Sequence, residues 1–85
     1  MGDKKLLVVF TSYYFGDKAD KILTELSVPH QLMATPSELN DMCGLSIQID
    51  LNTVEQVQTI LKEHKISTSG LFWYEKGKPV LAYKD

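Results

Sequence analysis

Two amphipathic stretches constrain the fold of this chain most, because each follows a short apolar run and carries an apolar stripe at helical spacing. The first begins at Phe15, and Pro29, which cannot continue a helix, fixes its end. The second follows Asn52, whose spacing to Glu55 predicts a capping box. The stripes comprise Phe15, Ala19, Ile22, Leu23 and Leu26 in the first stretch and Val54, Val57, Ile60, Leu61 and His64 in the second. We therefore expect two helices, each packed by one face against another layer.

Strands are predicted on both sides of each helix. Residues 6–10 are apolar without alternation, which is typical of a strand in the middle of a sheet. Residues 45–49 alternate between apolar and polar, which predicts a strand with one buried face. Further strands are expected at 30–34, 70–74 and 80–83.

The predicted order is strand, helix, strand, strand, helix, strand, with one more strand at the C-terminus. This order favours the α+β class and a ferredoxin-like β-α-β-β-α-β sandwich with an added C-terminal β-hairpin strand. In that topology the first and third strands are central neighbours, and both helices cover one face of the sheet. The chain has 85 residues and 44% hydrophobic content, which is enough for one core, so residues 1–85 are expected to form a single domain.

Charge and hydropathy exclude several classes of partner. The chain has a net charge of -2 and no arginine, so it lacks the basic excess of nucleic-acid-binding proteins. The apolar run near the N-terminus stops at Phe10, which is short for a signal peptide and far short of a membrane span, so no membrane partner is expected. Cys43 is the single cysteine, which together with the missing export signal favours a reducing, cytoplasmic setting.

Cys43 stands directly before Gly44 at the predicted entrance of the third strand. In the expected topology this entrance meets the exit of the first strand, where Ser12 leads into the first helix. The N–H groups of that helix and the Ser12 hydroxyl would favour a thiolate or persulfide on Cys43, and Gly44 would let another molecule approach the sulfur. A short helix predicted over 36–42, with Thr35 as its N-cap, would oppose this effect, because a helix C-terminus disfavours a thiolate.

A structural role for Cys43 stays open, because free cysteines are often buried and behave as small hydrophobes. His64 closes the inner stripe of the second helix and is expected to be half-buried, whereas His30 is expected to be exposed. Lys65 and His64 are expected at the same edge as Cys43. Neither histidine shares ligand spacing with Cys43, so neither a metal nor a cofactor is expected.

Two aromatic runs flank the predicted strands. Tyr13, at the start of the first helix, is expected to help line a pocket or docking surface beside Cys43. In the second run, alternation sends Trp73 to the face opposite Phe72 and Tyr74, so part of this run must meet solvent or a partner. A homodimer through this sheet face or through the sheet edge is therefore expected.

The Cys-Gly pair belongs to a longer pattern of short motifs. These motifs are Phe10-Thr11-Ser12, Val28-Pro29, Pro36-Ser37-Glu38-Leu39 and Cys43-Gly44. From Leu6 to about Phe72 the chain resembles the selenium/sulfur carrier protein-like family, a set of short bacterial and archaeal proteins. It departs from the family pattern at Ser37, where the family often has an arginine, and this removes one contact for an anion.

The resemblance implies a carrier, not an enzyme, in which Cys43 holds sulfur or selenium as a persulfide or selenopersulfide. Its partners would be a donor, such as a cysteine or selenocysteine lyase, and an acceptor protein. Gly44 would give access to the sulfur, and Ser12 and Tyr13 would bind it. Two alternatives remain: a regulatory or protein-interaction module in which Cys43 is structural, and a thiol-redox protein that uses a resolving thiol from elsewhere.

Overall fold

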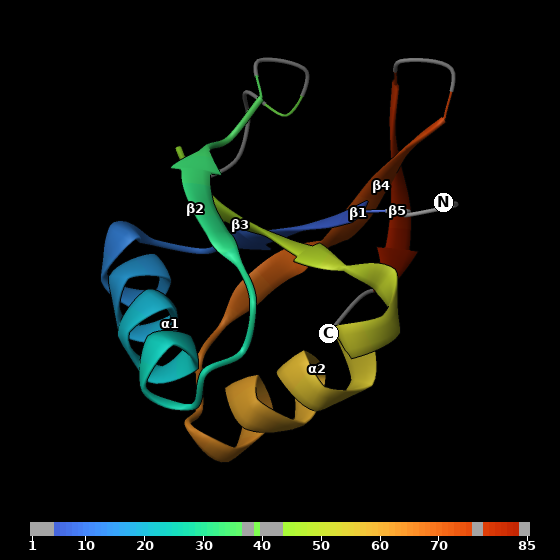
Figure 1. The fold of residues 1–85 in the computed structure, drawn as a ribbon. Helices are drawn as coiled ribbons and strands as arrows, with labels where there is room; N and C mark the ends of the chain where they lie inside the picture. The colour runs from blue at the N-terminus through green and yellow to red at the C-terminus, as the bar shows by residue number, and fades with distance from the viewer. Residues whose placement is uncertain (1–4, 37–38, 40–43, 76–77, 84–85) are drawn as a thin grey trace.

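The computed structural model describes residues 5–36, 39, 44–75 and 78–83. Within these residues five strands form one antiparallel sheet and two α-helices lie on the same side of it (Figure 1). The elements are β1 (Lys5–Phe10), α1 (Tyr13–Glu25), β2 (Gln31–Ala34), β3 (Leu45–Asp50), a 3-10 turn (Leu51–Thr53), α2 (Val54–Glu63), β4 (Thr68–Glu75) and β5 (Lys78–Tyr83). The α+β class and the predicted order of elements are therefore confirmed.

The strands lie in the order β2-β3-β1-β4-β5, so β1 is central and has β3 and β4 as its neighbours. The register pairs Val9 with Ser46 and Phe10 with Thr68. The exit of β1 therefore meets the entrances of both β3 and β4 at one edge of the sheet. The predicted pairing of the first and third strands is confirmed, and it fixes the position at which the chain passes from β1 to α1.

The helix-covered face of the sheet holds the larger hydrophobic cluster. Alternate residues of β1 and β3 point into it and meet the inner stripes of both helices. In α2 the predicted stripe is confirmed at its four apolar positions. The cluster comprises Leu6, Val8, Phe10, Ala19, Leu23, Val28, Ile47, Ile49, Val54, Val57, Ile60, Leu61, Ile66 and Leu71. No helix in the described part of the chain is long and apolar enough to cross a membrane.

The opposite face of the sheet carries a smaller cluster, formed by Leu7, Val9, Leu39 and Phe72. Leu39 comes from the connection between β2 and β3, and its N–H donates to the Pro36 carbonyl at 2.9 Å. The predicted short helix over 36–42 otherwise lies outside the described residues. Leu39 covers β1 on the side that has no helix, so this face also has a packed core.

Ser46 corrects the prediction that alternation leaves one face of β3 to solvent. It lies on the face opposite the helices and is 0% exposed. Its hydroxyl is hydrogen-bonded to the Thr35 hydroxyl, which satisfies a buried polar group. Alternation placed Ser46 on the correct face, but it could not show that this face is covered.

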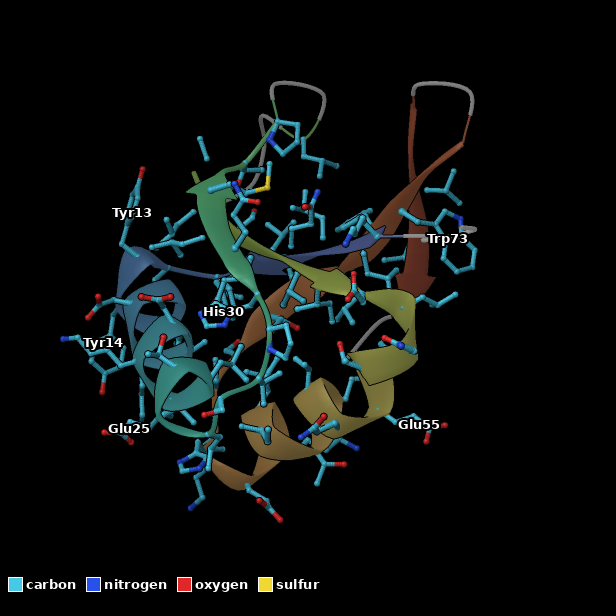
Figure 2. The ribbon with its side chains drawn as sticks, viewed as in Figure 1. Tyr13, Tyr14, Glu25, His30, Glu55 and Trp73 are labelled. Atoms are coloured by element: carbon cyan, nitrogen blue, oxygen red, sulfur yellow. The ribbon has the colours of Figure 1, made fainter. Side chains whose placement is uncertain are left out.

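The two histidines have the reverse of the predicted environments. The His30 side chain is only 9% exposed, and its Nε2 and Nδ1 lie 2.7 Å from Asp20 Oδ1 and 2.7 Å from the Val28 carbonyl oxygen. His64 is exposed, because α2 ends at Glu63 and the left-handed Lys65, at φ 56°, turns the chain away. His30 therefore links α1 to the start of β2, as Figure 2 shows.

The predicted capping box at Asn52 is wrong. Leu51–Thr53 form a 3-10 turn, and the N-cap of α2 is Thr53. The Thr53 hydroxyl donates to the Asp50 carbonyl at 2.8 Å, which ties the start of α2 to the end of β3. Glu55 remains in the first turn of α2, where a negative charge complements the helix dipole.

Candidate functional site

The candidate site lies where β1 ends, α1 begins and β3 begins. Cys43 lies outside the described residues, so the structure describes its surroundings through Gly44, which follows it in the chain. Ser12 and Tyr13 are both described and lie at the start of α1. Because β1 and β3 pair in antiparallel register, these residues come to the same edge of the sheet as Gly44.

Ser12 is the N-cap of α1. Its extended backbone, at φ -159° and ψ 162°, places its hydroxyl oxygen to accept from the Phe15 N–H at 3.4 Å. Its carbonyl accepts from the Gly16 N–H at 3.1 Å. None of the first-turn residues of α1, all of which are described, is acidic, so no side chain of that turn neutralises its positive end.

Tyr13 lies directly over Gly44. A Cβ atom added at Gly44 would lie 2.6 Å from the Tyr13 hydroxyl oxygen, which is closer than real atoms approach. Tyr13 is nevertheless 66% exposed, and Figure 2 shows its side chain pointing away from the body of the molecule. The absence of a side chain at Gly44 therefore makes room for the phenol, and a molecule that approaches Gly44 meets Tyr13.

Gly16 was missed by sequence reasoning, although it fixes the position of α1. A Cβ atom at Gly16 would lie 2.5 Å from Leu45 Cδ2, so the first turn of α1 packs closely against the entrance of β3. A glycine inside a helix costs about 1 kcal/mol relative to alanine. Because of that cost, a glycine inside a predicted helix indicates that another part of the chain approaches the helix closely there.

The chain that contains Cys43 leaves the sheet and returns to it at one hydrogen-bonded pair. The Thr35 N–H donates to the Gly44 carbonyl at 2.8 Å, directly after β2 and directly before β3. Leu39, between these two residues in the chain, packs on the sheet face opposite the helices. Thr35 and Gly44 are therefore joined by a hydrogen bond at the sheet, Leu39 between them packs on it, and sequence reasoning predicted neither contact.

The end of α2 does not join the site as expected. The Thr11 N–H and hydroxyl both donate to the Ser67 carbonyl at 3.4 Å, so the chain after α2 does return to the exit of β1. However, Figure 1 shows α2 ending at the foot of the view, whereas α1 begins higher, at the level of the sheet. The end of α2 therefore lies apart from the start of α1.

The groups that gather at this edge suit a small anion. The site has the N-terminus of a thirteen-residue helix, the Ser12 hydroxyl and the Tyr13 phenol. Helix N–H groups and hydroxyls stabilise thiolates and other anions. Among the described residues, no three His, Asp or Glu side chains lie together as a metal site would require. The edge therefore has groups of the kind that stabilise an anion, and no described ligand set there would hold a metal ion.

Comparison with known proteins gives one match. Residues 5–72 match the family described as "Putative Se/S carrier protein-like", whereas no curated protein and no solved structure matches the chain. The matched range includes Ser12, Tyr13, Gly44 and Cys43 and ends within β4, so β5 lies beyond it. Because the match covers most of the 85 residues, the chain belongs to this selenium/sulfur carrier protein-like family.

Proposed function

We propose that this protein carries sulfur or selenium on Cys43, between a donor protein and an acceptor protein. The observation that supports this most is the placement of Gly44 beneath the Tyr13 phenol and beside the uncompensated N-terminus of α1. Cys43 is the residue directly before Gly44. The family membership supports the same conclusion.

The transfer step is an exchange between sulfur atoms. A donor, such as a cysteine or selenocysteine lyase, offers the atom as a persulfide or selenopersulfide. The Cys43 thiolate attacks the outer atom, a new bond to the Cys43 sulfur forms, the donor's bond breaks, and its electron pair leaves with the donor thiolate. An acceptor nucleophile then takes the atom in the same way and releases the Cys43 thiolate. The exchange involves no net oxidation, and the atom stays on Cys43 until the acceptor takes it, which is the role of a carrier.

The residues around Gly44 have separate parts in this proposal. Ser12 and the N-terminus of α1 stabilise the anionic sulfur before and after loading. The Tyr13 hydroxyl donates to the bound atom, and the exposed ring swings aside when a partner approaches. A reduced thiol with no second cysteine in the chain fits a cytoplasmic carrier.

The fold assignment is part of the proposal. We assign the chain to the ferredoxin-like folds, with β5 as an added hairpin strand. The central β1 and β3, the outer β2 and β4 and the two helices on one face support that assignment.

Intact mass measurement tests the proposed function. The reduced protein is incubated with a cysteine or selenocysteine lyase and its amino-acid substrate, desalted without reductant, and measured beside Cys43→Ser. We expect the wild-type chain to gain one sulfur or selenium atom and the variant to gain none. Ser12→Ala and Tyr13→Phe should load more slowly, since each removes one group that stabilises the charged sulfur.

Two results would contradict the proposal. In one, the wild-type chain and Cys43→Ser gain mass equally. In the other, the wild-type thiol stays unmodified by the lyase and also resists alkylation, which would make Cys43 structural and favour the protein-interaction module.

A further inference from the structure

The two edges of the sheet differ in how they are protected against another strand. β2 forms one edge and β5 the other, and each pairs with a single neighbour (Figure 1). Natural sheets protect their edges with charged residues and proline. β5 contains Lys78 and Pro79, whereas β2 has the sequence Gln-Leu-Met-Ala, with neither a charge nor a proline. In the part of the chain that the structure describes, the β2 edge therefore has less protection of this kind than the β5 edge.

The ladder shows which backbone groups of β2 face outward. The Thr35 N–H donates to the Gly44 carbonyl, so Thr35 and Gly44 are a hydrogen-bonded pair. In an antiparallel ladder hydrogen-bonded and non-hydrogen-bonded pairs alternate, so Met33 also points its backbone groups toward β3. Leu32 and Ala34 then direct their N–H and C=O groups away from the sheet. Two donors and two acceptors are available at this edge.

A strand that adds to this edge must meet a simple requirement. Leu32 is 41% exposed and Ala34 is exposed, and both lie on the same face of the strand. An added antiparallel strand should place a small residue opposite Leu32 and a larger apolar residue opposite Ala34. It should also carry no charge that would be buried by pairing.

β2 itself meets this requirement. When two copies pair antiparallel about a two-fold axis through Met33, Leu32 lies opposite Ala34 of the partner subunit. Both outward-facing residues of each strand are then used, which gives four backbone hydrogen bonds. Because β2 has no charged residue, self-pairing places no like charges opposite each other.

We propose that the protein forms a homodimer by antiparallel pairing of β2 with β2 of a second copy, which makes one continuous sheet. The pairing is isologous, as expected of a two-fold dimer. Gly44 pairs with Thr35 on the inner side of β2, so the proposed pairing uses no backbone group of Gly44. The dimer and the carrier function can therefore fail independently.

Sedimentation equilibrium of the whole chain tests the proposal. The edge is short, so we expect the average mass to rise from one chain toward two between about 10 μM and about 1 mM protein. Ala34→Pro removes the outward N–H of each copy, two of the four hydrogen bonds, and should raise the dimer Kd at least about tenfold. Ala34→Ser keeps this N–H and is the matched control.

Leu32→Lys keeps the test valid if Ala34→Pro does not fold, because it adds an exposed charge to the same edge and should also weaken the dimer. A wild-type chain that stays monomeric throughout the range, or dimers unaffected by both variants, would overturn the proposal. A monomeric chain would instead favour pairing of the β2 edge with an extended segment of another protein.

A cross-linking experiment tests the register. On the two-fold axis the Met33 Cα atoms of the two copies lie about 4.5 Å apart, within reach of a disulfide. With oxidised glutathione as the oxidant, Met33→Cys in a Cys43→Ser background should give a covalent dimer. Gln31→Cys in the same background lies off the axis and should give little covalent dimer. Equal cross-linking of the two variants would contradict this register.

Discussion

The two faces of the sheet are built for different tasks. On the helix-covered face, residues from three strands and both helices form one large cluster. On the opposite face, a few residues of β1 and β4 are closed by Leu39. The first face collects residues from the whole length of the chain, whereas the second depends on the segment that also contains Cys43. Stability should therefore depend mainly on the first face, and the position of Cys43 on the second.

Leu23→Ala should give the largest loss of stability. Leu23 is 1% exposed between α1 and the sheet, and truncating such a residue costs about 2–5 kcal/mol. Denaturant unfolding measures the loss. At denaturant concentrations where the variant stays folded, the alkylation rate of Cys43 should match that of the wild-type chain. A faster rate would show that the two faces are not independent.

Compared with Leu23→Ala, Leu39→Ala should reduce stability less and change the alkylation rate of Cys43 more. Leu39 is 9% exposed in a small cluster, so we expect a loss of about 2 kcal/mol, near the lower end for such truncations. The alkylation rate of Cys43 should change several-fold, because Leu39 precedes Cys43 closely in the chain and loses its packing against the sheet. An unchanged alkylation rate of Cys43, together with a loss of stability as large as that of Leu23→Ala, would contradict the distinction between the two faces.

The two histidines sharpen the comparison within the helix layer. His30→Ala removes the polar contacts of the imidazole with Asp20 of α1 and with the Val28 carbonyl before β2, so we expect a loss of about 1–2 kcal/mol. His64→Ala is the matched control, because His64 is exposed and its loss should stay within about 0.5 kcal/mol. Thermal unfolding of both variants checks this. Equal losses would mean that the hydrogen bonds of His30 contribute nothing measurable.

Gly44→Ala should have only a small effect on stability. The added methyl group meets the end of the exposed Tyr13 side chain, which can move aside, so the loss should stay below about 1 kcal/mol. A second substitution, Tyr13→Ala, should remove that loss, and a double-mutant cycle by denaturant unfolding measures the coupling. Additive losses would show that Tyr13 does not occupy the space over Gly44 in solution.

The fold could be predicted where its signals are local. The apolar run of β1, the alternation in β3 and the stripe of α2 each follow from the periodicity of one element. The N-cap of α2 was misplaced because Asn52 and Thr53 are both good capping residues. The choice of Thr53 depends on its hydrogen bond to Asp50, which closes the preceding turn.

The surroundings of the site could be predicted only in part. The meeting of β1 and β3 followed from topology, so Ser12, Tyr13 and Gly44 were expected at one edge. The packing of Leu39 on the far face and the burial of Ser46 were not predicted, because neither contact follows from the periodicity of one element. The environments of His30 and His64 were reversed because both depend on where a helix ends and how the chain turns after it.

A load-and-chase measurement tests the central claim most directly. The wild-type chain is loaded by a cysteine lyase, and part of it is then incubated with an excess of acceptor thiol. Both samples are digested without reductant, and the mass of the peptide containing Cys43 is measured in each. We predict one extra sulfur on that peptide, which the acceptor thiol then removes. An extra sulfur on any other peptide, or one that the acceptor thiol cannot remove, would contradict the carrier role of Cys43.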